Sequence, residues 1–177
     1  MTKPATLSAG IAIANRWGSN VPTIEQADEL QIAYLHALDR RDMRAWMESF
    51  SVRDGSYACI ARENEEQGLS LALMLDDCPA RLHDRVKYIT EVWVGTFEDY
   101  HTRHFVQRLS TSALDGDLLS VSSNFIVAYT TMRGRSEILV TGAYEDVIAI
   151  ENGRACFKSQ KAVLDTIVTP RYLVYPV

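Results

Sequence analysis

The sequence predicts an α+β fold in which helices in the N-terminal half cover a long, curved antiparallel sheet in the C-terminal half. Three turn dipeptides, Asp115-Gly116, Arg133-Gly134 and Asn152-Gly153, are separated by segments that are each long enough for an extended strand. Glycine supplies the positive φ that tight hairpin loops require, and Asn-Gly is a strong hairpin signal. The apolar spacing also changes from helical to alternating at about Thr102. Something must fill the concave face of such a sheet, and function depends on what does.

Two helices are predicted before the first strand. The first runs from about Thr23 to Asp39, where Thr23 can cap the helix and Gln26 stands at the position of a capping box. A second, short helix follows Asp42, which is a good N-cap residue. Apolar residues recur at helical spacing in both, namely Ala27, Leu30, Tyr34, Leu35 and Leu38 in the first and Met43, Trp46, Met47 and Phe50 in the second.

A strand and a third helix are predicted next. The stretch Gly55 to Arg62 reads as a strand, and the charged run Glu63 to Gln67 as a solvated loop. Pro79 stands where a helix can begin. The third helix would have one apolar face of Leu82, Val86 and Ile89, with Arg81, Arg85 and Lys87 outside it.

The long strands are predicted from residues that alternate between the two faces of a sheet. Gly142 inside one of them suggests a bulge or a bend. Val121, Ser123, Phe125, Val127 and Tyr129 are expected to share one face, and Ile138, Val140, Gly142, Tyr144 and Ile148 to share another.

Length and charge set further limits. The 177 residues suit one domain, for which we predict a single unit over residues 23–177 preceded by an N-terminal arm of residues 1–22. A formal net charge of -5 and the lack of a basic run argue against nucleic-acid binding, which needs clustered Lys and Arg to neutralise phosphates.

Cysteine usage favours a reduced, cytoplasmic setting. Cys59, Cys78 and Cys156 are odd in number and widely spaced, unlike a disulfide framework or a thiolate metal site. The apolar stretch Leu7 to Ala14 has some features of a signal peptide, but it is short and Gly10 interrupts it. No stretch approaches the ~20 apolar residues of a membrane span.

The sequence carries no motif that declares a chemistry. It has no glycine-rich phosphate loop, no Gly-x-Ser-x-Gly, no His-Glu-x-x-His and no Cys/His pairing for an iron-sulfur cluster. His101 and His104 have a spacing that would suit a metal in a helix. They lie where a strand is expected to begin, and in a strand they would point to opposite faces.

Six residues are candidates for acid-base chemistry because a helix-covered concave sheet can bury a carboxylate or an imidazole. They are Asp39, Asp54, His104, Tyr34, Tyr57 and Tyr144. The structural interpretation of each is stronger. Asp39 is expected to end a helix, Asp54 to belong to a turn before Gly55, and the tyrosines to be amphipathic core residues.

Five short blocks of residues stand out between about residues 24 and 168. They are Leu38-Asp39-Arg40-Arg41-Asp42 with Trp46, Phe50, Asp54 and Tyr57; Asp76-Asp77 with Arg81-Leu82 and Asp84-Arg85-Val86; Thr102-Arg103-His104 with Val106; Ser123-Asn124-Phe125; and Gly142 with Tyr144-Glu145-Asp146-Val147 and Lys161 to Asp165. No block is specific alone, but in this order and spacing they resemble the β (small) subunits of aromatic-ring-hydroxylating dioxygenases. The chain departs from the family pattern at Ala58-Cys59, Asp99-Tyr100-His101 and Arg154-Ala155-Cys156.

The resemblance implies a cone-shaped fold similar to nuclear transport factor 2 and scytalone dehydratase. It implies a structural subunit without catalytic, cofactor-binding or metal-binding residues. The Rieske [2Fe-2S] cluster and the mononuclear non-haem iron would then belong to a catalytic α subunit, assembled as three α and three β subunits and supplied with NAD(P)H electrons by a reductase or ferredoxin. The reaction would be cis-dihydroxylation of an aromatic compound, with a substituted benzoate such as anthranilate as the suggested substrate.

Apolar surface residues are expected to be buried between such subunits. Trp93, Phe97, Tyr172 and Tyr175 are the candidates, and the apolar tail Pro170 to Val177 is expected to pack on a neighbour or back on the sheet.

Two alternative functions remain, because one fold hosts many functions. One is a stand-alone dehydratase, isomerase or cyclase that uses a pocket Asp, His or Tyr, and the other is a small binding protein with a ligand in the cone.

Overall fold

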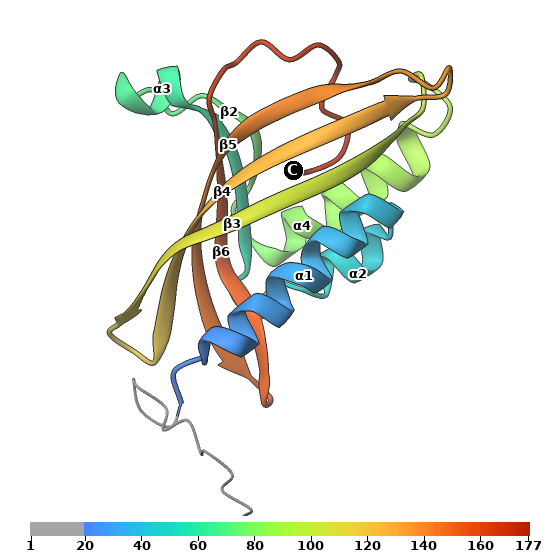
Figure 1. Cartoon of the computed structure of the whole chain (residues 1–177). Coiled ribbons are helices and arrows are strands. Elements are labelled where there is room, and N and C mark those ends of the chain that lie inside the picture. The colour runs from blue at the N-terminus through green and yellow to red at the C-terminus, as the bar shows by residue number, and fades with distance from the viewer. Residues whose placement is uncertain (1–19) are drawn as a thin grey trace, which may run out of the picture.

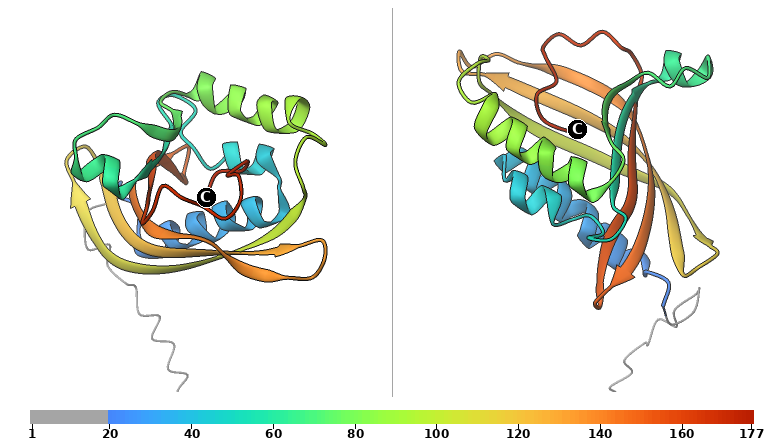
Figure 2. Two further views of the ribbon diagram at one scale, coloured as in Figure 1. Left: turned by 90° about the horizontal axis from the view of Figure 1, so that it is seen from above. Right: turned by 180° about the vertical axis from the view of Figure 1, so that it is seen from behind.

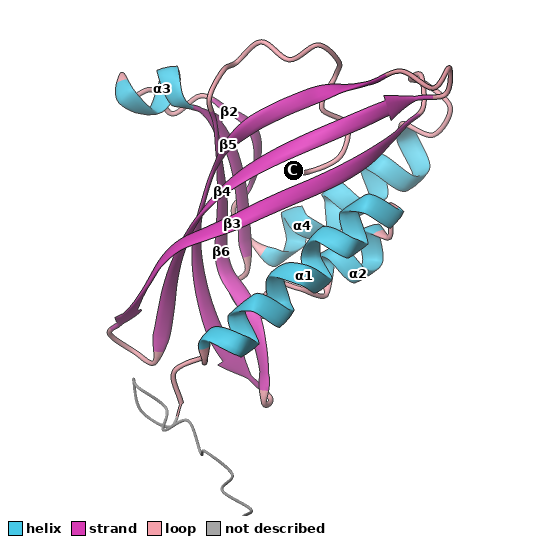
Figure 3. Ribbon diagram, in the orientation of Figure 1, coloured by secondary structure: helices cyan, strands magenta, loops and turns pink. Residues whose placement is uncertain are grey.

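A six-stranded, strongly curved sheet wraps around helices on its concave side (Figure 1). The structure is a computed structural model and describes residues 20–177, so most of the predicted arm of residues 1–22, including Leu7 to Ala14, lies outside the described residues. The strand order is β2-β1-β6-β5-β4-β3. Neighbouring strands are antiparallel except β1 and β6, which are parallel. The α+β prediction with a curved sheet and N-terminal helices is therefore confirmed (Figure 3).

The first two helices begin at the predicted caps. Helix α1 spans Ile24–Arg40, and the capping box is present, because Thr23 Oγ1 accepts from the Gln26 amide at 3.2 Å and Gln26 Oε1 accepts from the Thr23 amide at 2.9 Å. Helix α2 spans Met43–Met47, and its cap Asp42 accepts from the amide of Ala45 at 3.0 Å. The predicted apolar stripes of both helices are buried except at Leu35 and Met47, which are partly buried.

The next segment contains β1 (Ser56–Ala61), α3 (Arg62–Glu66), β2 (Ala72–Asp76), α4 (Pro79–Lys87) and a π-helical turn η1 (Tyr88–Val92). The predicted strand and third helix are confirmed. The loop predicted for Glu63 to Gln67 is wrong, because most of this segment forms α3, whose residues are strong helix formers and remain unburied. Strand β2 carries no prediction, since its continuous apolar run Leu71 to Leu75 lacks the alternation that marks a strand.

Four long strands complete the sheet: β3 (Tyr100–Leu114), β4 (Leu118–Thr131), β5 (Ser136–Glu151) and β6 (Arg154–Leu164). The three predicted turns connect them. Gly116, Gly134 and Gly153 have φ of 77°, 82° and 78°. Such positive φ angles strain side-chain-bearing residues, so the glycines at these positions are what allow the tight connections.

The predicted faces are confirmed for β4 and only in part for β5. All five named residues of β4 are buried. On β5, Ile138 is 57% exposed because Leu139 is an extra residue: Val127 pairs with Val140, whereas the neighbouring Ala128 pairs with Ile138. This bulge sends Ile138 to the outer face. A bulge at Gly142 is not found, since its pairing is regular on both sides. A Cβ atom there would lie 2.2 Å from the carbonyl oxygen of Val163, so close approach explains this glycine.

The core lies between the concave face and the helices, and the C-terminal segment runs into it. Seen from above, the sheet and helices surround this segment (Figure 2). Val174 and Val177 are buried, at 4% and 2% exposure. The prediction that the tail packs on a neighbour or back on the sheet is thus met by packing inside the chain's own cone.

Candidate functional site

The interior of the cone is occupied by the tail. The main-chain oxygen of Val177 accepts a hydrogen bond of 2.8 Å from the Tyr34 hydroxyl, which also lies 3.2 Å from Gln160 Oε1. The amide of Val177 donates to the Tyr57 hydroxyl at 3.1 Å. Helix α1 and strand β1 therefore both hold the end of the tail, and Gln160 of β6 lies against the Tyr34 hydroxyl that does so.

Three predicted candidates, Tyr34, Tyr57 and Tyr144, meet in this interior. Each is at most 1% exposed. Burial raises the pKa of all three phenols well above their ordinary value, so they remain protonated at neutral pH and cannot act as bases. The Tyr144 hydroxyl is buried without a hydrogen-bond partner, while its ring stacks on Phe125 with centroids 4.2 Å apart. The core interpretation of these tyrosines fits the geometry.

Asp39 and His104 are in contact, although the sequence predicted them only as separate candidates. Asp39 ends α1 and His104 lies on β3, and their Oδ1 and Nδ1 atoms are 2.7 Å apart. The His104 amide also donates to Asp39 Oδ2 at 3.3 Å. Burial alone would raise the pKa of Asp39, but the hydrogen bonds and charge of His104 outweigh it and hold this pKa below its usual value. The other ring nitrogen, His104 Nε2, is buried without a partner.

The space beside this pair is too small for a substrate. A cavity of about 10 Å³ lies between His104 and Thr102 of β3 and the tail residues Tyr175 to Val177. That volume accommodates about one water molecule, whereas small-molecule sites measure roughly 300–1,000 Å³. The Asp39–His104 pair could polarise a bound group that contacts His104. The tail residues Tyr175 to Val177 already lie on that side of His104.

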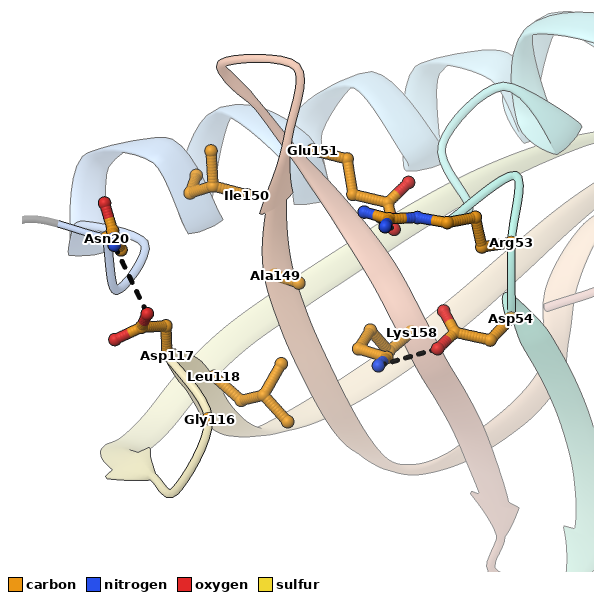
Figure 4. A pocket seen from close by; sticks show the side chains of 10 residues that line it. All are labelled: Asn20, Arg53, Asp54, Gly116, Asp117, Leu118, Ala149, Ile150, Glu151 and Lys158. Carbon is orange, nitrogen blue, oxygen red and sulfur yellow. Dashed lines mark hydrogen bonds and ion pairs between the residues drawn. The ribbon is translucent and has the colours of Figure 1, made fainter.

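Asp54 lies elsewhere, beside Lys158 of β6 (Figure 4). It lines a surface hollow of about 420 Å³ together with the turn at Gly116 and the ends of β5 and β6. Its carboxylate is 2.7 Å from Lys158 Nζ and 2.7 Å from Ser51 Oγ, and these contacts lower its pKa. The structure therefore brings Asp39 and His104 together and leaves Asp54 apart from them, in the turn position predicted for it.

Two buried polar residues were missed as site residues. Asp146 is 1% and Gln160 0% exposed, and they face each other across β5 and β6. Both carboxylate oxygens of Asp146 and the Gln160 Nε2 lack hydrogen-bond partners. Burial, aided by the charge of Glu145, raises the pKa of Asp146 well above its ordinary value. The sequence did contain a sign that Asp146 is buried. It lies two residues from both Tyr144 and Ile148, so all three side chains are expected on the same, inner face of the strand.

A larger cavity, of about 900 Å³, opens at the mouth of the cone; we call it the mouth cavity. Its walls are β2 at Leu73 and Met74, the connection over residues 93–100, and residues 167–174, which include the first part of the tail. The lining is mostly apolar and aromatic. Three residues of this lining were predicted from the sequence, but as contact residues between subunits: Trp93, Phe97 and Tyr172.

No metal centre emerges from the described part of the chain. Residues 20–177 contain no group of three His, Cys, Asp or Glu side chains placed to hold a metal ion. His101 is exposed and His104 is buried, which agrees with their expected positions on opposite faces of a strand. The three cysteines are free, and burial raises the pKa of Cys59 to about 12 and of Cys156 to about 11. Within the same residues, no helix is long and apolar enough to cross a membrane.

Comparison with known families identifies the family of this chain. The model of the ring hydroxylating beta subunit family matches residues 35–171. The chain belongs to this family. The resemblance inferred from the five sequence blocks is thereby confirmed, and the protein is a β subunit.

Relatives of this β subunit are dioxygenase subunits. It is 25% identical to the anthranilate 1,2-dioxygenase small subunit of Burkholderia cepacia over 84% of this chain and 90% of the relative. It is 26% identical to the terephthalate 1,2-dioxygenase terminal oxygenase component subunit beta 2 of Comamonas sp., over 84% of this chain and 98% of the relative. An oxidoreductase complex of the ring-hydroxylating type is the setting in which these relatives act.

Solved structures place the fold in the expected group. A structure assigned as the β subunit of an aromatic-ring-hydroxylating dioxygenase of Novosphingobium aromaticivorans has a TM-score of 0.72 and 28% identity, covering 81% of this chain and 90% of that chain. A structure assigned as a scytalone dehydratase of the same organism has a TM-score of 0.61 and 16% identity, covering 84% and 87%. At that identity the second likeness shows the fold alone, and it confirms the predicted cone.

Proposed function

We propose that this β subunit performs no chemistry itself and serves as a structural component of a terminal oxygenase. The observation that carries the proposal is the closed interior. The Asp39–His104 pair faces a cavity of about 10 Å³, and the tail residues Tyr175 to Val177 line that cavity. A chain in which this acid-base pair is shut off from substrates is suited to support a partner's active site rather than to provide one.

The partner in this proposal is a catalytic α subunit, with three α and three β subunits in the assembly. The Rieske cluster and the mononuclear iron would lie in that α subunit, since the described residues 20–177 offer no donor set that fits either group. Electrons would come from NAD(P)H through a reductase or ferredoxin, and the complex would act in the cytoplasm. The reaction proposed is cis-dihydroxylation of an aromatic acid such as anthranilate, because both named relatives act on benzoate-type acids.

Apolar side chains on the outside of the cone support burial against neighbouring subunits. Phe105 on β3 is 61% exposed and pairs directly with Ile126 on β4, which is 43% exposed. Ile138, turned outward by the bulge in β5, lies on the same face. We call Phe105, Ile126 and Ile138 the outer patch. Contiguous apolar surface of this kind marks contacts with other proteins.

A second exposed apolar surface lies on the edge strand β2. Leu73 and Leu75 are 41% and 47% exposed, while Met74 between them is buried. Strands that carry apolar side chains on both faces are usually covered on both faces. Of the four predicted contact residues, Tyr172 is 81% exposed and fits this role. Phe97 and Tyr175 pack against each other inside the chain, with ring centroids 6.0 Å apart, so the outer patch and β2 replace them in the proposal.

The proposal is tested by purifying the tagged chain from its native host grown on aromatic acids, then recording the mass and visible spectrum of the material. A brown, iron-containing complex with a larger protein is expected. A colourless chain without a partner would contradict the proposal. Substituting Phe105 in the same preparation separates a specific contact from a chance association.

A second candidate function is favoured by one observation, the buried Asp39–His104 pair with an unpartnered Nε2. Such a pair can act as a general base when a substrate reaches it. A stand-alone dehydratase, isomerase or cyclase would require a turnover by the isolated chain that His104→Asn abolishes. The matched control is His101→Asn, which changes an exposed imidazole on the same strand.

A further inference from the structure

We propose that the mouth cavity is a binding site for a neutral aromatic molecule of one or two rings. This site is separate from the closed interior and from the Asp39–His104 pair. Its volume of about 900 Å³ is within the range of small-molecule sites. It exists with the tail in place, so no rearrangement of the tail is needed to form it.

The lining supplies contacts that suit an aromatic ring. Trp93, Phe97, Tyr100 and Tyr172 contribute aromatic groups from two segments that are distant in sequence. The rings of Trp93 and Phe97 are 6.4 Å apart and tilted by 46°, so they are not stacked on each other. Aromatic rings attract one another in offset or edge-to-face arrangements, and a bound ring can adopt either against these walls. Leu73, Val168 and Leu173 complete an apolar wall.

The charges of the lining predict that the ligand is neutral. The charged side chains Glu98 and Arg171 are paired with each other at 2.9 Å. An ionised ligand would lose hydration without gaining an unpaired counter-charge, and that loss is costly.

Three of the four hydroxyl groups of the lining are also engaged within the chain, and the fourth, that of Tyr172, belongs to a side chain that is 81% exposed. Thr96 Oγ1 donates to the Trp93 carbonyl at 2.7 Å, Thr169 Oγ1 to the Arg171 carbonyl at 2.6 Å, and the Tyr100 hydroxyl to the Tyr172 carbonyl at 3.2 Å. Arg171 Nε is buried without an acceptor. A ligand with one neutral oxygen, such as a phenol, can accept from this N–H, and because Glu98 already neutralises the charge of Arg171 it does so without adding an unpaired charge.

The test uses 2-naphthol as the probe and the full chain as the protein, with binding measured by equilibrium dialysis and calorimetry. We expect one saturable site. The charged analogue 2-naphthoate, which has a similar size and shape, is expected to bind about tenfold more weakly, or more weakly still.

A matched pair of variants locates the site. Val168 lines the cavity and is 75% exposed, whereas Val52 is 78% exposed and does not line it. We expect Val168→Glu to weaken 2-naphthol binding about tenfold or more and Val52→Glu to leave it unchanged. Because both side chains are exposed, neither variant should unfold the chain, and circular dichroism checks this.

Three results would overturn the proposal: no saturable binding of 2-naphthol, equal binding by the two glutamate variants, or equal affinity for 2-naphthoate. If 2-naphthol does not bind and Val168→Glu instead abolishes association with a large subunit, the mouth is a protein contact and the proposal is wrong. None of these binding results depends on the structural role proposed above, which the purified complex tests on its own.

Discussion

The Tyr34 hydroxyl donates a 2.8 Å hydrogen bond to the main-chain oxygen of Val177, linking the first helix to the tail across 143 positions of sequence. This contact stands at the centre of the core, where Tyr34 also meets the edge of the Phe157 ring with centroids 5.4 Å apart. The closed interior therefore depends on a residue pair that no local pattern connects.

Tyr34→Phe should destabilise the chain by about 0.5–1.5 kcal/mol, because it removes the shorter of the two hydrogen bonds that the buried Val177 oxygen accepts, the other coming from the Tyr57 hydroxyl at 3.5 Å. Urea unfolding measures the change. Tyr172→Phe is the matched control, since the Tyr172 side chain is 81% exposed. Equal stability of the two variants would show that the hydrogen bond does not hold the tail.

Deleting residues 171–177 should lower the melting temperature, since burial of Val174 and Val177 contributes about 1.5–3 kcal/mol each. Differential scanning calorimetry and size-exclusion chromatography make the comparison. Val168→Ala, which shortens an exposed residue just before the tail, should change the melting temperature little. A deleted chain with unchanged melting temperature and unchanged oligomeric size would refute the packing role of the tail.

Asp146→Asn should stabilise the chain increasingly as the pH rises. Burial raises the pKa of the Asp146 carboxyl in the folded state, so the folded state holds a proton that the unfolded state releases above about pH 4. Stability is then lost as the pH rises from about 4 toward the folded pKa, by at most about 1.4 kcal/mol per pH unit, and the amide removes this dependence.

The measurement for Asp146 is urea unfolding at pH 5 and pH 8. The gain of the amide over the original chain should be larger at pH 8. Asp84→Asn alters an exposed carboxyl and should show no such trend. A gain that is the same at both pH values would mean that Asp146 is ionised in the folded protein.

Phe105→Glu should weaken association with the large subunit while leaving the fold of the isolated chain intact, because this side chain is 61% exposed in the free subunit. Burying an unpaired charge in an interface costs several kcal/mol. Co-purification yield and the melting temperature of the isolated chain are the two readings. Val52→Glu serves as the control, and equal yields from both variants would exclude the outer patch from the contact.

Sequence patterns predicted the elements whose signals are local. The Thr23 capping box, the three glycine turns and the buried face of β4 all follow from residues a few positions apart, and each is present. The bulge at Leu139 was not predicted, because an extra residue in one strand is visible only against its partner strand. Strand β2 was missed because apolar side chains on both faces erase the alternation.

The site was predictable only as a set of separate residues. Asp39 and His104 were both named, but they are 65 positions apart and only the packing of α1 on β3 brings them together. The same holds for the tail, whose apolar composition predicted burial but not entry into the cone. Asp146 belongs to one of the blocks that resemble the family. The sequence does not show, however, that its buried carboxylate lacks hydrogen-bond partners.

The position of Val177 has a consequence for the order in which the molecule can be completed. Synthesis proceeds from the N-terminus at about 5–20 residues per second, and domains begin to fold as they emerge. The hydroxyls of Tyr34 and Tyr57 are made early, but the main-chain groups that pair with them belong to residue 177. The hydrogen bonds that join the tail to α1 and β1 can therefore form only after residue 177 has left the ribosome, so closure of the interior is among the last steps of folding on the ribosome.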